Sequence, residues 1–274
     1  MMRRPIPSTG EMLPVVGCGT WQTFDVGTSG VEREPLGQVL QALVAGGGSL
    51  VDSSPMYGRA EAVAGDLVGK LGIRHRTFLA TKVWTRGRDA GIAQLARSQS
   101  LLGGGQPLDL VQIHNLVDWR THLPVLRDWK ASGRIRYIGI THYTSGAHAE
   151  LSAVMQSEDI DFVQVNYSLS DRAAEQSLLP LAAARGIAVL VNRPLGEGQL
   201  VSRLRRLPLP DFAAELGCGS WPELALKYLL GHEAVSSVIP ATRNPEHMAS
   251  NARAGTGALP DADLRRRILQ SAGL

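Results

Sequence analysis

The chain has 274 residues, an apolar fraction of 44% and a net charge of +3, which together fit one large α/β domain with a complete hydrophobic core. No apolar run is long enough to span a membrane, the mostly scattered basic residues disfavour nucleic-acid binding, and the isolated cysteines Cys18 and Cys218 predict neither a disulfide framework nor a metal site. We expect one domain over residues 1–274 that is cytoplasmic, lacks a signal peptide and is monomeric by default.

Short apolar runs of strand length alternate with longer amphipathic stretches along the whole chain. Strands are predicted at residues 15–20, 49–53, 78–81, 109–114, 137–141, 162–166, 188–192 and 237–240. Helices are predicted at residues 35–45, 89–102, 123–131 and 173–184, after the N-cap candidates Ser220 and Asn244, and in the tail that follows Leu259. Residues 194–218 carry no clear pattern and are predicted to form a long functional or mobile loop.

Eight strands that alternate with helices imply a parallel sheet with right-handed crossover connections. We therefore predict a closed (β/α)8 TIM barrel, for which a doubly wound open sheet is the alternative. The glycines of Gly17-Cys18-Gly19 suggest the dinucleotide fingerprint of an open sheet, but the third glycine of that fingerprint would fall on Gln22. The glycine pattern therefore favours the barrel.

Polar side chains stand at the ends of the second, third and fourth predicted strands, as Asp52, Lys82 and His114, and Tyr57 lies on the loop after Asp52. The carboxyl ends of barrel strands meet at one end of the barrel, where catalytic residues gather. Each residue alone is typical of a structural position, but a shared site explains their common placement better. The chain shows no cluster of metal ligands and no nucleophile with an adjacent base.

These four groups suit the reduction of a carbonyl. A Lys82 ammonium, anchored by Asp52, is expected to lower the pKa of Tyr57 from its ordinary value near ~10. Tyr57 would then donate a proton to a carbonyl oxygen, and His114 would donate a hydrogen bond to the same oxygen. The hydride for such a reduction has to come from a cofactor.

Motifs along nearly the whole chain are similar to those of the aldo-keto reductase family. The matching segments are residues 17–21, 51–58, 80–82, 111–114, 138–142, 163–167, 193–196 and 238–251. The resemblance implies a (β/α)8 barrel whose bottom is closed by an N-terminal β-hairpin around residues 6–13, and NAD(P)H-dependent reduction of aldehydes or ketones to alcohols. It places the catalytic roles on Asp52, Tyr57, Lys82 and His114, with Tyr57 as the proton donor.

The resemblance also implies a nicotinamide cofactor, NADP(H) by preference and NAD(H) as the second choice. Thr141 and His142 replace the family's usual Ser-Asn pair that holds the nicotinamide amide, and Gln164 is the third amide contact. Many members place a tyrosine after strand seven to stack on the nicotinamide ring, where this chain has Asn192 and Arg193. The remaining implied contacts are Pro194, Leu195, Thr242, Arg243, His247 and Asn251, the last four at the adenosine end with its 2′-phosphate.

Aromatic side chains follow predicted strands one and three, and their positions resemble those of the aromatic residues that surround the substrate in the family. The implied substrate contacts are Trp21, Phe24 and Trp84, together with His114. Little chain follows the last barrel helix to form a long flap, so we expect an open pocket for a small-molecule carbonyl substrate.

Two other functions stay open. One is an NADP(H)-binding regulatory or redox-sensing protein with slow or no turnover, because the residues for the amide and the ring differ from the family's usual ones. The other is an isomerase or lyase that forms a Schiff base on Lys82, which requires a lysine without a tightly paired acid.

Overall fold

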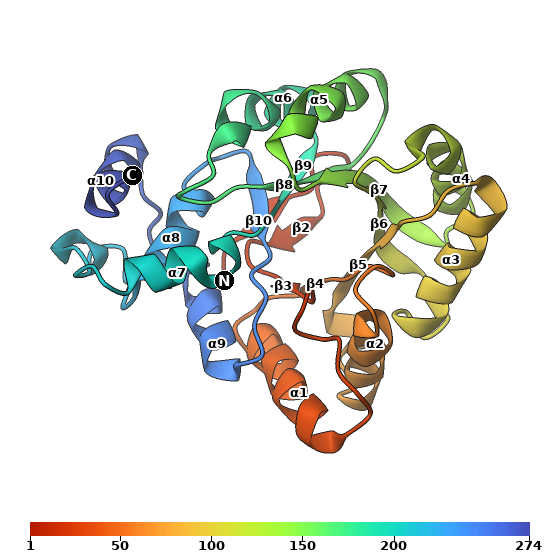
Figure 1. Ribbon diagram of the computed structural model, residues 1–274, viewed down its shortest axis with the longest axis horizontal. Coiled ribbons are helices and arrows are strands. Elements are labelled where there is room, and N and C mark those ends of the chain that lie inside the picture. Colours follow the sequence, from red (N-terminus) through yellow and green to blue (C-terminus); the bar gives the residue numbers. More distant parts are fainter.

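Eight parallel strands, β3 to β10, form the centre of the computed structural model, which describes residues 1–274 (Figure 1). Each strand is hydrogen-bonded to the next strand in chain order. Single parallel bridges from Val16 to Val238 and from Gly19 to Ala241 join the first strand to the last. The sheet is therefore closed, which confirms the predicted (β/α)8 barrel and excludes the open sheet.

Parallel strands that are buried on both faces are continuous apolar runs, and for that reason their positions are readable from sequence. The barrel strands are β3 (Cys18–Gly19), β4 (Leu50–Asp52), β5 (Phe78–Val83), β6 (Leu108–His114), β7 (Ile135–His142), β8 (Phe162–Asn166), β9 (Ala188–Asn192) and β10 (Val235–Val238). The first strand is shorter than the predicted 15–20, because Val15 to Gly17 make only the few hydrogen bonds to Val238 that close the barrel.

Ten α-helices surround the barrel (Figure 1). They are α1 (Gly30–Ala45), α2 (Ala60–Lys70), α3 (Arg88–Leu101), α4 (Trp119–Ala131), α5 (His148–Ser157), α6 (Leu178–Arg185), α7 (Gln199–Leu204), α8 (Trp221–Leu230), α9 (Pro245–Arg253) and α10 (Ala262–Ser271). The predicted N-caps are confirmed, since Ser220 and Asn244 accept hydrogen bonds from backbone amides in the first turns of α8 and α9. The predicted helix 173–184 breaks at Ser177 into a 3-10 turn and α6.

A two-stranded hairpin closes the bottom of the barrel. β1 (Arg3–Pro5) pairs antiparallel with β2 (Met12–Pro14). Ile6 and Leu13 are buried among the side chains that fill the barrel interior, and the Thr9 hydroxyl lies 2.8 Å from the Tyr137 hydroxyl. The Arg4 guanidinium donates to the carbonyls of Leu230 and His232, which ties the hairpin to the end of α8. The predicted hairpin is therefore confirmed.

Side chains alternate along each strand, so every second residue points into the barrel. On β5 the inner row runs from Phe78 to Lys82, and on β6 it runs from Leu110 through Gln112 to His114. The rows begin apolar at the hairpin end and finish polar at the carboxyl end. The hairpin end of the barrel is therefore packed with apolar side chains, whereas the carboxyl end of the strands carries the polar side chains.

The C-terminal helix α10 lies beside α7 at the edge of the molecule (Figure 1). Arg203 on α7 donates hydrogen bonds to the carbonyls of Ala272 and Gly273, which hold the end of the chain in place. None of the helices combines the length and the apolar character that crossing a membrane requires.

Candidate active site

The carboxyl ends of the strands open into a cavity of about 640 Å³, a size typical of small-molecule and cofactor sites. It brings together eleven of the residues predicted from the sequence: Trp21, Asp52, Tyr57, Trp84, His114, Thr141, Gln164, Asn192, Arg193, Pro194 and Leu195. Its lining includes aromatic residues near β3 and β5 and the segment Ile239–Ala241 after β10. Lys82 lies behind its wall, fully buried.

Asp52 and Lys82 form a buried ion pair at the base of the cavity. The Lys82 ammonium donates to Asp52 Oδ2 at 2.7 Å and to the Ser53 carbonyl at 2.8 Å. Gln112 donates to the other carboxylate oxygen of Asp52 at 3.2 Å. Burial lowers the pKa of Lys82, but the interactions with Asp52 and Tyr57 outweigh burial and raise it overall. Lys82 is therefore a fixed ammonium at neutral pH.

This pairing does not fit a Schiff-base enzyme. A nucleophilic lysine has to be neutral and accessible to its substrate, whereas Lys82 is fully buried and paired with a carboxylate. The isomerase or lyase alternative is therefore not supported by the geometry.

Tyr57 stands over the ion pair on the turn between β4 and α2. The Lys82 nitrogen lies 5.0 Å from the centre of the Tyr57 ring. The next residue, Gly58, has a φ of +61°, and a Cβ there would lie 2.4 Å from the Asp25 carboxylate, so only glycine allows this turn to pack so closely. The backbone at Gly58 thus fixes the direction in which the phenol enters the cavity.

The pKa of Tyr57 is shifted upward, whereas the sequence analysis predicted a downward shift. Burial raises the pKa of the phenol, the Lys82 ammonium lowers it, and the Asp52 carboxylate raises it again, so that the pKa ends above its ordinary value. The prediction was wrong because it counted the ammonium without the desolvation of the phenolate. Tyr57 is consequently a protonated phenol at neutral pH with a cation close by.

His114 is held by a residue that sequence reasoning missed. The Ser54 hydroxyl lies 3.0 Å from His114 Nδ1 and also accepts a hydrogen bond from the Met56 amide. Burial, with the charges of Lys82 and His142, lowers the pKa of His114 to about 3. The imidazole is therefore neutral over the physiological pH range.

The neutral His114 predicts a pH dependence of stability. Its pKa of about 3 in the folded protein lies below the ordinary 6.5, so between these values the unfolded chain binds the extra proton. Stability from this group is complete above pH 6.5 and is lost as the pH falls toward 3, by up to about 1.4 kcal/mol per pH unit. Urea unfolding between pH 4 and 7 measures this slope. We expect His114→Gln to flatten it and His75→Gln, at an exposed histidine, to leave it unchanged; equal slopes in the wild type and His114→Gln would contradict the assignment.

Two tryptophans flank the candidate catalytic groups. The Trp21 ring lies 4.9 Å from the Tyr57 ring, and the Trp84 ring lies 6.3 Å from the His114 ring. Gln94 on α3 bonds both the amide and the carbonyl of Trp84, which fixes that wall of the cavity. Phe24 does not line the cavity: the backbone turn after Thr20 directs its ring into the hydrophobic core, where it is fully buried.

The predicted amide-binding residues are only partly brought together. Thr141 and Gln164 face each other across β7 and β8, and the Thr141 hydroxyl donates to Gln164 Oε1 at 3.3 Å. The amide nitrogen of Gln164 is buried without a partner, which is unusual unless a ligand or water completes it. His142 does not line the cavity and instead accepts a hydrogen bond from the Thr144 amide. The unpaired Gln164 nitrogen as donor and the Thr141 hydroxyl oxygen as acceptor therefore fit a carboxamide, with His142 left out of the set.

The predicted adenosine-end residues lie outside the cavity, around the start of α9. Arg243 donates to the carbonyls of Gln22 and Thr23, so part of its guanidinium already holds the loop after β3. His247 is exposed on α9, and Asn251 is buried. The Thr242 hydroxyl oxygen accepts a hydrogen bond from the backbone amide of Asn244, the N-cap of α9. Thr242 and Arg243 directly follow Ala241, which lines the cavity.

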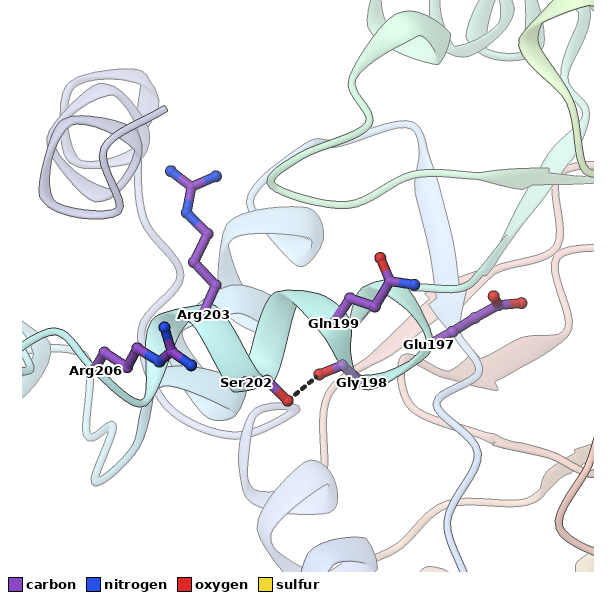
Figure 2. Close-up of a pocket in the computed structure, with 6 residues that line it drawn as sticks. All are labelled: Glu197, Gly198, Gln199, Ser202, Arg203 and Arg206. Atoms are coloured by element: carbon purple, nitrogen blue, oxygen red, sulfur yellow. Dashed lines mark hydrogen bonds between the residues drawn. The ribbon is translucent and has the colours of Figure 1, made fainter.

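A second hollow of about 570 Å³ adjoins the cavity along α7 (Figure 2). It is lined by Glu197, Gly198, Gln199, Ser202, Arg203 and Arg206. The Ser202 hydroxyl donates to the Gly198 carbonyl within this helix. Figure 2 shows the Glu197 side chain directed away from α7, whereas the Arg203 side chain extends toward α10, whose end it holds. The stretch 194–218, predicted as a loop, thus contains α7 and forms one side of the site.

Ser54, Gln112, Tyr143 and Glu197 are site residues that sequence reasoning did not single out. Gln112 could have been predicted from the sequence, because it lies two positions before His114 on the same strand and its side chain therefore points into the barrel interior as well. Ser54 had none, since its role depends on the fold of the turn before Tyr57. Tyr143 and Glu197 line the cavity from loops that the sequence pattern does not position.

The comparisons with known proteins agree with this geometry. The model of the aldo/keto reductase family matches residues 15–267. An NADH-specific methylglyoxal reductase of Escherichia coli is 26% identical over 96% of each chain, and a second methylglyoxal reductase of that organism is 27% identical over 96% of this chain and 93% of its own. An aldo/keto reductase of Klebsiella pneumoniae, solved with NADP and acetate, is 23% identical with a TM-score of 0.84 over 98% of this chain and 95% of its own.

A family match that covers most of the chain agrees with a closed barrel whose inner rows end in Asp52, Lys82 and His114 beneath Tyr57. The protein therefore belongs to the aldo/keto reductase family.

Proposed function

We propose that the protein is an NADPH-dependent reductase that converts small aldehydes or ketones to alcohols. The observation that carries this proposal is a protonated Tyr57 placed over the buried Asp52–Lys82 pair, beside a neutral His114, in one open cavity. This set supplies a proton and hydrogen bonds to a carbonyl oxygen, and it contains no nucleophile or metal-ligand cluster.

NADP(H), when bound, supplies or accepts the hydride. Tyr57 gives its phenolic proton to the substrate oxygen as the carbonyl is reduced, so one hydride and one proton convert the carbonyl to an alcohol. The Lys82 ammonium stabilises the phenolate that is left behind, and Asp52 holds the ammonium in place. In this proposal Nδ1 of His114 accepts a hydrogen bond from Ser54 at 3.0 Å, so that the proton on Nε2 is donated to the same substrate oxygen.

The cofactor assignment rests on the donors that line the cavity. Thr141 and Gln164 would hold the nicotinamide carboxamide, with the orphaned Gln164 nitrogen as the donor. Pro194 and Leu195 would border the pyrophosphate, and Arg243 with Thr242 would hold the 2′-phosphate. We propose NADPH as the preferred cofactor and NADH as an accepted one, in keeping with an NADP complex of one similar protein and the NADH specificity of another.

The substrate class follows from the walls of the cavity. Trp21 and Trp84 stand on either side of the oxygen-binding groups, and Trp84 is 41% exposed, so the mouth is open and apolar. Such walls accept small carbonyl compounds with few polar groups. The methylglyoxal reductases among the relatives act within this class.

Cofactor binding is tested by tryptophan fluorescence, with Trp21 and Trp84 as reporters inside the cavity. We expect saturable quenching by NADPH and by NADH, with the tighter binding for NADPH. Gln164→Ala removes one buried hydrogen bond and should weaken both by ~3- to 10-fold, whereas Gln38→Ala, at an exposed glutamine on α1, should not change them. No quenching by either dinucleotide would overturn the proposal.

A further inference from the structure

A stack of three planar groups stands at the ends of β7 and β9, and two of them, Tyr143 and Arg193, line the cavity. The His142 ring and the Tyr143 ring are nearly parallel, with an angle of 8° and centres 5.7 Å apart. The Arg193 guanidinium carbon lies 4.8 Å from the centre of the Tyr143 ring. Tyr143 lines the open cavity and is 44% exposed. The stack therefore presents a guanidinium to whatever ligand the cavity holds.

Glu197 fixes the orientation of this guanidinium. Arg193 Nε lies 2.9 Å from Glu197 Oε1, and the two terminal amino groups of Arg193 have no partner in the protein. Both residues adopt positive φ, 49° for Arg193 and 52° for Glu197, which is uncommon for side chains of this size. Two strained positions in one short loop are typical of a functional site. In Figure 2 the Glu197 carboxylate points away from α7, to the side of the loop on which the barrel strands lie.

Charge in the cavity is balanced, and Arg193 carries the accessible positive charge. Lys82 is buried and paired with Asp52, and His114 is neutral. The remaining charges are those of Arg193 and Glu197, both partly exposed. Loss of the Arg193 charge would leave the cavity net negative, and loss of the Glu197 charge would leave it net positive.

We propose that Arg193, opposed by Glu197, makes the site discriminate between the reduced and oxidised forms of the nicotinamide cofactor. The inference rests on the proposed function. Oxidised nicotinamide carries a positive ring charge that the reduced ring lacks, while both forms have the same phosphates. Thr141 and Gln164, the proposed contacts of the carboxamide, lie on β7 and β8, and Arg193 directly follows β9, the next strand. A cation at this end of the cavity therefore repels only the oxidised form, which favours binding of the hydride donor and release of the spent cofactor.

The test measures dissociation constants for NADPH, NADP⁺, NADH and NAD⁺ by tryptophan fluorescence. The quantity of interest is the oxidised-to-reduced ratio, because the phosphate contacts cancel within each pair. We expect Arg193→Gln to lower this ratio by about tenfold, the order expected for a unit charge several ångströms away in a protein-like dielectric. Arg193→Lys keeps the charge and should keep the ratio, and Glu197→Gln should raise it. Both dinucleotide pairs should respond alike.

An unchanged ratio in both Arg193→Gln and Glu197→Gln would overturn this inference. Equal weakening of the reduced and oxidised forms in Arg193→Gln would also overturn it, since that result places the guanidinium on the phosphates. Absence of binding to the wild-type protein is a different outcome and would reject the proposed function. If Arg193→Gln fails to fold, Glu197→Gln still tests the inference, because the oxidised-to-reduced ratio of dissociation constants has to rise in that variant.

Discussion

Replacement of Tyr57 by phenylalanine is expected to lower kcat/KM for carbonyl reduction by about 10²- to 10⁴-fold, the usual contribution of a positioned general acid. The substitution removes the proton donor and keeps the ring that packs on Trp21 and over Lys82. The dissociation constant for NADPH should therefore stay within about twofold of the wild-type value, since no hydrogen bond to the cofactor is assigned to the phenol. Steady-state kinetics and fluorescence titration of the same preparation measure both quantities.

The matched control is Tyr137→Phe, which removes a phenolic hydroxyl at the barrel bottom, where it bonds Thr9. This variant should lose some stability and keep the reaction rate. Wild-type turnover by Tyr57→Phe would show that the proton comes from another group.

Lys82→Met is expected to remove activity and to destabilise the fold by about 3–5 kcal/mol, the cost of leaving one partner of a buried ion pair alone. Asp52 would remain almost fully buried, with Gln112 as its one remaining side-chain partner. Loss of the ammonium would also raise the pKa of Tyr57 further, because Lys82 is the main group that lowers it. Urea unfolding and kcat/KM measure the two effects.

The double variant Asp52→Asn/Lys82→Met separates the fold from the chemistry. It removes both charges, so much of the lost stability should return while the activity stays low. Recovery of activity together with stability would mean that the ion pair has only a structural role. An unchanged unfolding free energy in Lys82→Met would contradict the buried pair itself.

The sequence predicted the barrel well because its strands have to be apolar on both faces. The strands at 162–166 and 188–192 agree with β8 and β9 to the residue. Helix α2 was not predicted, although its buried residues Ala60, Val63, Ala64, Leu67 and Val68 recur at helical spacing. Two glycines, Gly65 and Gly69, lower the helix propensity of the segment. One of them, Gly65, lies so close to α3 that a Cβ would meet the Leu101 carbonyl at 2.0 Å. Close packing against the end of α3 thus accounts for a glycine that helix propensity alone disfavours.

The candidate site was predictable where a residue's direction follows from strand geometry, and less so elsewhere. Asp52, Lys82 and His114 end inward rows, so their meeting follows from the closed barrel. Phe24 and Arg243 lie on turns, where a shift of one residue decides whether a side chain reaches the cavity, the core or a neighbouring carbonyl. The positions of Phe24 and Arg243 in the sequence therefore could not predict where their side chains point.

The energetics of the site were also beyond sequence analysis. The ammonium at Lys82 was expected to dominate the pKa of Tyr57, but the fold buries the phenol and reverses the net direction. A pKa depends on how much water the fold leaves at a group as well as on its neighbours.

The most direct test of the central claim is transfer of a labelled hydride. The protein is incubated with NADPH deuterated at the reactive nicotinamide carbon and with a panel of small aldehydes and ketones, methylglyoxal among them. Mass spectrometry then follows deuterium in the alcohol. The proposed function predicts deuterated alcohol from the wild-type protein and almost none from Tyr57→Phe. Saturable NADPH binding without any deuterated alcohol would contradict it and favour a cofactor-binding regulatory protein.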